Sequence, residues 1–166
     1  MRVPIRKPGK YAHLKPDVHL TEAKFNELTR SLERLKTVSR PAAVIEVRRL
    51  VELGDFSENA AYQMAKGRLR GINQRILELE DRTKHAVIIT PTKNVATVQL
   101  GHRVTIEIAG KQAAYVILGS AETNPLGGVI SHHSPLGSAL MGHAVGDRVT
   151  IQSGGKGVEC RIIKIE

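Results

Sequence analysis

Apolar residues recur at helical spacing in the first part of the chain. Phe25, Leu28, Leu32 and Leu35 lie three or four positions apart, and the period resumes after Pro41 at Ala43, Val44, Val47, Leu50 and Val51. Thr21 stands where an N-cap is expected. Pro41 has no N–H and disfavours helical geometry at Arg40. We therefore expect one long helical arm with a kink near Pro41.

A second helical stretch carries a stricter repeat. Its apolar residues step by four, three, four and three, at Ala65, Leu69, Ile72, Ile76 and Leu79. A helix from about Ser57 to Lys84 would extend roughly 42 Å at 1.5 Å per residue. Each stretch has one apolar stripe, so we expect the two to pack together. The pattern predicts an antiparallel coiled-coil hairpin over residues 20–85 that projects from the rest of the protein.

Beyond Lys84 the apolar period changes from helical to alternating, which is typical of strands. Strands are expected at Val87–Ile89, Val104–Ile108, Tyr115–Leu118, Val129–Ile130, Val149–Ile151 and Val158–Ile165. Ala109–Lys111 and Gly154–Gly155 are expected turns, and Ser134–Pro135 begins a short helix that ends before Gly142. Residues 86–166 are therefore predicted to form an α+β domain, a mostly antiparallel sheet with one short helix.

The turn between the two helical stretches, Gly54–Asn59, is polar and acidic. Gly54 can leave a helix with positive φ, and Asp55 or Ser57 can cap the next one. Acidic residues near a helix N-terminus have an ordinary role, since they complement the exposed N–H groups. The hairpin, however, would carry Asp55 and Glu58 about 40 Å from the main body, at 1.5 Å per helical residue. That position favours a function over capping alone.

The formal net charge is +9, and its distribution suggests a polyanionic partner. Residues 1–19 contain three prolines and a net charge of +4, so we expect a basic flexible arm. A solubilising tail and a nucleic-acid contact both remain open for it. Aromatic residues make up 3% of the chain and Trp is absent, which argues against base stacking and in favour of phosphate contacts.

Several classes of protein and site are disfavoured. The sequence has no apolar run long enough to span a bilayer and no signal-peptide pattern, so we expect a cytoplasmic protein with no membrane partner. The single cysteine, Cys160, excludes an internal disulfide and should be buried. His132 and His133 have no acidic or sulfur partner nearby in the sequence, and we expect them to be exposed loop residues rather than metal ligands.

Two segments resemble one known family. Residues 50–63 contain the pattern Gly-Asp-x-x-Glu-Asn-Ala-x-Tyr, and Ser134–Gly142 is followed by Val145-Gly146-Asp147. The chain resembles the bacterial Gre transcript-cleavage factors, GreA and GreB, from about Leu20 to its C-terminus. The basic residues of the second helix look closer to the GreB branch. Residues 1–19 extend beyond the usual start of the family.

The resemblance implies a transcription elongation factor that binds bacterial RNA polymerase. The C-terminal domain would have an FKBP-like fold and dock near the secondary channel of the polymerase, through Ser134, Pro135, Leu136, Gly146 and Asp147. The hairpin would enter that channel. Asp55 would help to hold a Mg²⁺ shared with the polymerase, and Glu58 would position or deprotonate the attacking water. The factor would stimulate cleavage of backtracked RNA by the polymerase, and would be neither an enzyme nor a metal binder alone.

Other positions acquire expected roles from the same resemblance. Phe56, Asn59 and Tyr62 would order the tip or meet the polymerase. Lys66, Arg70 and Arg75 would contact the 3′ end of the nascent RNA, with Lys66 and Arg70 forming a cationic strip one helical turn long. DNA is a second polyanion that the basic residues could contact. We expect a monomer.

Three rival interpretations exist. A polymerase inhibitor of the same fold would block the channel without stimulating cleavage, but its tip would be expected to alter the two carboxylates. A peptidyl-prolyl isomerase would need an aromatic pocket, whereas Tyr115 is the only Phe, Trp or Tyr in residues 86–166. A coiled-coil adaptor would explain the heptads but not the tip motif.

Overall fold

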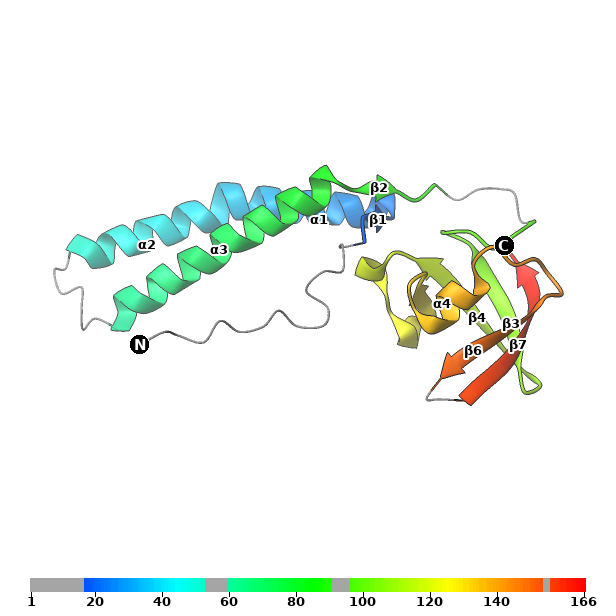
Figure 1. Ribbon diagram of the computed structural model, residues 1–166. Helices are drawn as coiled ribbons and strands as arrows, with labels where there is room; N and C mark the ends of the chain where they lie inside the picture. Colours follow the sequence, from blue (N-terminus) through cyan, green and yellow to red (C-terminus); the bar gives the residue numbers. More distant parts are fainter. Residues whose placement is uncertain (1–16, 53–59, 91–95, 154–155) are drawn as a thin grey trace, which may run out of the picture.

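The computed structural model describes residues 17–52, 60–90, 96–153 and 156–166, and its first part is a helical hairpin (Figure 1). Helix α1 (Glu22–Arg34) continues through a π-helical turn (Leu35–Ser39) into α2 (Arg40–Glu52), and α3 (Ala60–Lys84) returns beside them. The 25 residues of α3 extend about 38 Å at 1.5 Å per residue. The end where α2 stops and α3 starts lies away from the C-terminal domain (Figure 1). The predicted projecting hairpin is confirmed.

The seam of the hairpin follows the predicted apolar stripe. Ala65, Ile76 and Leu79 of α3 are buried, as are Leu28, Ala43 and Leu50 on the facing helices. Thr21 caps α1 as predicted, because its Oγ1 accepts a hydrogen bond from the N–H of Lys24 at 3.2 Å.

The interruption near Pro41 differs from the expected kink. Arg40 keeps helical dihedrals, with φ −65° and ψ −48°, and the chain instead widens into the π-helical turn one turn earlier. The N–H of Arg40 donates to the carbonyl of Leu35, five residues back. A wider turn accommodates a proline that cannot donate a hydrogen bond and that crowds the preceding turn, so the helix passes Pro41 without ending.

The strand predicted at Val87–Ile89 is present at Val87–Ile88, but it does not join the sheet of the C-terminal domain as expected. Strand β2 (Val87–Ile88) instead pairs in parallel with β1 (His19–Leu20), and the two form a separate sheet at the base of the hairpin (Figure 1). Leu20 is buried there with Leu28 and Leu79. His19 therefore belongs to the hairpin base and not to a flexible arm.

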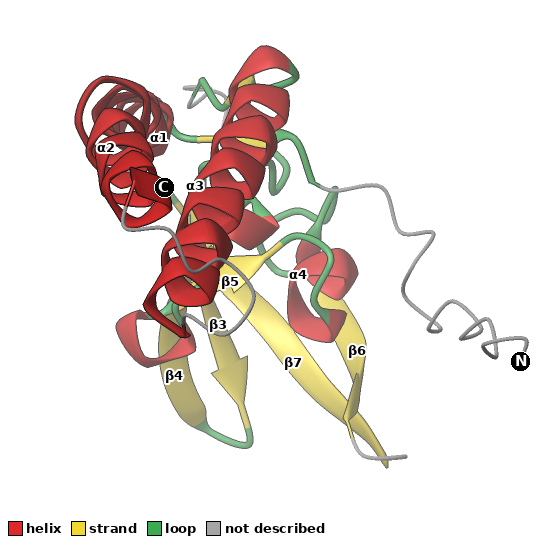
Figure 2. Ribbon diagram, turned by 90° about the vertical axis from the view of Figure 1, so that its left-hand side faces the viewer, coloured by secondary structure: helices red, strands yellow, loops and turns green. Residues whose placement is uncertain are grey.

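The C-terminal domain is built on a five-stranded sheet in the order β5-β4-β3-β7-β6 (Figure 2). Its strands are β3 (Arg103–Ile108), β4 (Lys111–Leu118), β5 (Val129–Ser131), β6 (Arg148–Ser153) and β7 (Lys156–Ile165). Only the β4–β5 pair is parallel among these strands. The turn between β3 and β4 has positive φ at Ala109 and Gly110, 49° and 78°, which suits a tight hairpin. The predicted α+β class is confirmed.

Helix α4 (Pro135–Leu140) covers one face of this sheet (Figure 2). The hydroxyl of Ser134 accepts a hydrogen bond from the N–H of Gly137 at 3.0 Å, and Pro135 occupies the first turn, as predicted. Leu140 and Cys160 are buried in the core between helix and sheet. Two short 3₁₀ turns, η2 (Ser120–Glu122) and η3 (Pro125–Gly127), connect β4 to β5. Among the described residues, no helix is both long and apolar enough to cross a membrane.

Candidate functional site

The acidic motif itself lies outside the described residues. Asp55, Phe56, Glu58 and Asn59 belong to residues 53–59, so their predicted catalytic and tip-ordering roles stay predictions. The structure describes both flanks of this segment, the end of α2 and the start of α3. Those flanks are at the end of the hairpin that is remote from the C-terminal domain (Figure 1).

The predicted RNA-contacting residues lie along the exposed side of α3. Lys66 and Arg70 are exposed, and neither forms an ion pair with another described residue. The Nζ of Lys66 lies 5.9 Å from the ring centroid of half-buried Tyr62, a cation–π distance. Arg75 is also exposed, but its Nη1 lies 3.3 Å from a carboxylate oxygen of Glu78. Lys66 and Arg70 are thus exposed one turn apart on α3, and their contact with RNA stays a prediction, whereas Arg75 is engaged within its own helix.

Three of the predicted docking residues begin helix α4. The side chain of Ser134 caps the helix, and Leu136 packs partly against the domain core, so both have a structural explanation. Pro135 is exposed.

The other two predicted docking residues form a turn before β6. Gly146 has φ +96°, which favours glycine, and Asp147 closes the turn by accepting a hydrogen bond from the N–H of Ala144 at 2.9 Å. That bond, together with His143 Nδ1 at 3.3 Å, lowers the pKa of Asp147. Both residues are exposed and remain available to a partner.

A polar junction between the hairpin base and the C-terminal domain was not predicted. The Glu122 carboxylate accepts hydrogen bonds from the backbone N–H of Thr21 at 2.7 Å and from its hydroxyl at 2.6 Å. A Cβ added at Gly119 would overlap the carbonyl of His19, so only glycine permits this approach. The partners are about a hundred positions apart in sequence, and no local pattern links them.

Asp17 is the centre of this junction. Its side chain is 5% exposed; Oδ2 accepts from the N–H of Ser120 at 2.6 Å, and Oδ1 accepts from the N–H of His19 at 3.1 Å. Burial alone would raise the pKa of Asp17. The hydrogen bonds from Ser120 and His19 outweigh burial and lower that pKa to about 2. Asp17 is therefore a nearly buried carboxylate that is ionised at neutral pH.

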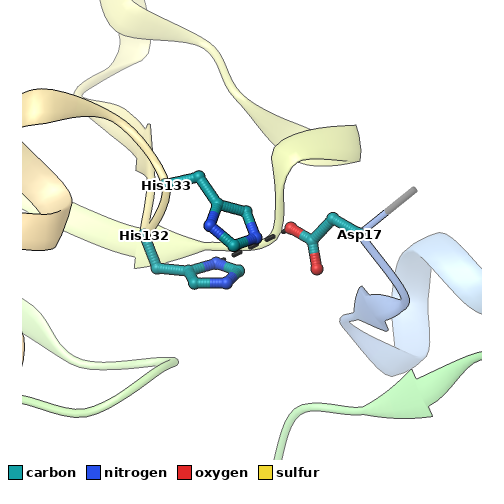
Figure 3. A group of neighbouring side chains, drawn as sticks. All are labelled: Asp17, His132 and His133. Carbon is teal, nitrogen blue, oxygen red and sulfur yellow. Dashed lines mark ion pairs between the residues drawn. The ribbon is translucent and has the colours of Figure 1, made fainter. Parts of the chain in front are cut away.

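The expectation for His132 was wrong. The His132 side chain is 14% exposed, and its Nδ1 lies 3.6 Å from Oδ2 of Asp17 (Figure 3). The sequence shows no acidic residue near His132 because Asp17 precedes it by more than a hundred positions, and only folding brings the two together. His133 is exposed, as expected.

Comparisons with known proteins identify the family. Residues 18–88 match the family model described as transcription elongation factor, N-terminal, and residues 92–166 match transcription elongation factor, GreA/GreB, C-term. The transcription elongation factor GreA of Bacillus cereus (strain ATCC 14579) is 38% identical over 150 residues, which cover 89% of this chain and 95% of that protein. GreA of Macrococcus caseolyticus (strain JCSC5402) is 38% identical over 149 residues, which cover 88% of this chain and 94% of that protein.

Among solved structures, GreA factor homolog 1 (Gfh1) of Thermus thermophilus is 31% identical, with a TM-score of 0.42, over 90% of this chain and 99% of that one. The family of this chain is assigned from the sequence comparisons and not from this structural likeness. The suggested closeness to GreB stays a prediction, since the relatives named here are GreA proteins. With both halves matched by the two family models and relatives covered almost end to end, this chain belongs to the GreA/GreB family of transcription elongation factors.

Proposed function

We propose that this elongation factor binds RNA polymerase and stimulates the polymerase to cleave backtracked nascent RNA. The observation that carries the proposal is the projecting hairpin, whose remote end is joined by the segment containing Asp55 and Glu58. An element about 38 Å long, at 1.5 Å per helical residue, suits delivery of side chains into a deep channel of a partner.

The chemistry of the segment suits a shared Mg²⁺. Carboxylate oxygens are ligands that Mg²⁺ accepts, and one or two of them hold it only together with oxygens from a substrate or partner. When bound, the metal ion supplies positive charge that stabilises the transition state of phosphodiester hydrolysis. Asp55 is the proposed metal ligand, and Glu58 is proposed to orient the attacking water and accept its proton. Two carboxylates bind Mg²⁺ weakly, so the isolated factor should have no nuclease activity.

The C-terminal domain is the proposed docking module. Pro135, Gly146 and Asp147 are exposed on it, and its core is separate from the hairpin core. A fragment of residues 92–166 leaves out the whole hairpin and the small sheet at its base. This fragment should compete with the full chain for polymerase without stimulating cleavage. If the folded fragment fails to compete at high concentration, docking lies elsewhere.

The decisive test is a cleavage assay on a stalled, backtracked polymerase complex. Asp55→Asn and Glu58→Gln should each remove most of the stimulated cleavage while polymerase binding stays within about twofold, because each loses an ionised oxygen and little contact area. Glu33→Gln alters an exposed carboxylate near the C-terminal end of helix α1, away from the tip segment; it is the matched control and should cleave normally. If the wild-type protein binds and slows the polymerase without stimulating cleavage, the protein is an inhibitor instead.

A further inference from the structure

We propose that Asp17, His132 and His133 form a binding site for a divalent transition metal such as Zn²⁺ at the junction of the hairpin base and the C-terminal domain (Figure 3). One carboxylate oxygen of Asp17 and one ring nitrogen of each imidazole lie within 4.8 Å of one another. Ligand atoms bound tetrahedrally to Zn²⁺ at about 2.0–2.2 Å lie about 3.3–3.6 Å apart, so the three atoms must draw closer by up to about 1.5 Å on binding. The set leaves a coordination position for water, as in three-ligand zinc sites.

The ligand types select the class of metal. Imidazole nitrogen suits Zn²⁺, Ni²⁺ and Cu²⁺, whereas Mg²⁺ prefers oxygen ligands throughout. This site is therefore different in kind from the Mg²⁺ proposed at the hairpin tip. The single thiol does not compete, since Cys160 is buried in the C-terminal core and burial raises its pKa.

Hydrogen bonds from neighbouring residues hold the ligands in place, as the hydrogen-bond partners of ligands do in known metal sites. The N–H of Ser120 donates to Oδ2 of Asp17 at 2.6 Å, and the Ser120 hydroxyl is hydrogen-bonded to the Ser131 hydroxyl at 2.8 Å. Ser131 in turn accepts from the backbone N–H of His133 at 3.1 Å. A continuous chain of hydrogen bonds thus connects the carboxylate ligand to the loop that carries both imidazoles.

Charge and access also suit a cation. The three ligands line a cavity of about 740 Å³, through which an ion can enter. Arg82 on the cavity wall opposes a bound cation, but Asp81 lies on the same wall and offsets it. The ligands come from two parts of the chain, Asp17 ahead of β1 and the two imidazoles after β5, so a bound metal would fasten the hairpin base to the C-terminal domain.

The test uses the full chain, stripped of metal with a chelator and titrated with Zn²⁺ by calorimetry and with Co²⁺ by visible absorption. Wild type should bind one equivalent, show the Co²⁺ bands of a low-coordinate site, and melt at a higher temperature with Zn²⁺. Mg²⁺ should produce none of these changes.

Variants locate the ion. His132→Gln and His133→Gln should each weaken Zn²⁺ binding at least about tenfold and reduce the melting shift, with helical circular dichroism unchanged. His143→Gln is the matched control: it alters an exposed histidine that also faces an aspartate, Asp147 at 3.3 Å, and should bind Zn²⁺ as wild type does. Absence of one-equivalent binding in the wild type, or unchanged affinity in the His132→Gln, His133→Gln double variant, would overturn the site.

Discussion

The Glu122 carboxylate of the C-terminal domain binds both the backbone N–H and the hydroxyl of Thr21, the N-cap of helix α1, at 2.7 and 2.6 Å. One acidic side chain thereby complements the positive end of a helix in the other domain. The Thr21 hydroxyl serves two partners, because it also accepts from the N–H of Lys24. The same hydroxyl therefore contributes both to the start of the helix and to the contact between the two domains.

Thr21→Val should destabilise the hairpin by about 1–2 kcal/mol, since it removes the cap and leaves one oxygen of Glu122 without its partner. Thr21→Ser restores the hydroxyl and should recover most of that stability. Urea unfolding followed by helical circular dichroism measures both. Equal stability of the Val and Ser variants would mean that the cap contributes nothing.

Leu79→Ala should lower the free energy of unfolding of the hairpin by about 2–5 kcal/mol, because a large buried side chain leaves a cavity. Leu79 is 1% exposed and packs with Leu20 and Leu28. Leu77, two residues earlier on the same helix, is 60% exposed. Leu77→Ala is thus a matched control and should change stability by less than about 0.5 kcal/mol. Similar losses of stability in the two variants would contradict the assignment of Leu79 to the buried seam of the hairpin.

The Lys66→Ala, Arg70→Ala double variant should weaken crosslinking of the nascent RNA 3′ segment to the hairpin. The plot of log affinity against log salt has a negative slope, and each lost phosphate contact with single-stranded RNA reduces the magnitude of that slope by about 0.7. The double variant should therefore reduce the magnitude by about 1.4. Arg75→Ala should have a smaller effect because Glu78 already engages that guanidinium.

The control for this strip removes charge elsewhere. Arg103 and Lys111 are exposed on the C-terminal sheet, and their double alanine variant should leave crosslinking unchanged. Deleting residues 1–16, which spares Asp17, tests the basic arm separately. An equal loss from all three changes would show that charge acts diffusely.

Asp147 should make stability depend on pH. Its pKa in the folded state is below the usual 3.8, chiefly because the N–H of Ala144 donates to its carboxylate. The stabilisation is therefore fully present above that usual value and is lost as pH falls through the folded pKa. Wild type should exceed Asp147→Asn in stability at neutral pH, and the two should converge in acid. NMR titration should still find a low pKa in His143→Gln, because the backbone bond remains; a normal pKa there would assign the effect to His143.

The features that the sequence determined by itself are those set by near neighbours along the chain. The apolar stripe of α3, the caps at Thr21 and Ser134, and the hairpin turn at Ala109–Gly110 each depend on residues within a few positions of one another. Their geometry follows from local backbone conformation and from the 3.6-residue or two-residue period. The acidic motif of Asp55 and Glu58 is likewise a local pattern, which the order of residues alone reveals, although its geometry lies outside the described residues.

Only the tertiary structure decided which distant residues meet. The residues Val87–Ile88 favour a strand but do not specify which sheet it joins. They pair with His19–Leu20 because the helical hairpin brings the chain back to the point where α1 begins. In the sequence alone, Asp17 is one acidic residue in a basic segment and His132 is a loop residue, because no local pattern identifies a partner that is distant along the chain. Their contact depends on the close approach of Gly119 to His19, which exists only once both domains have folded.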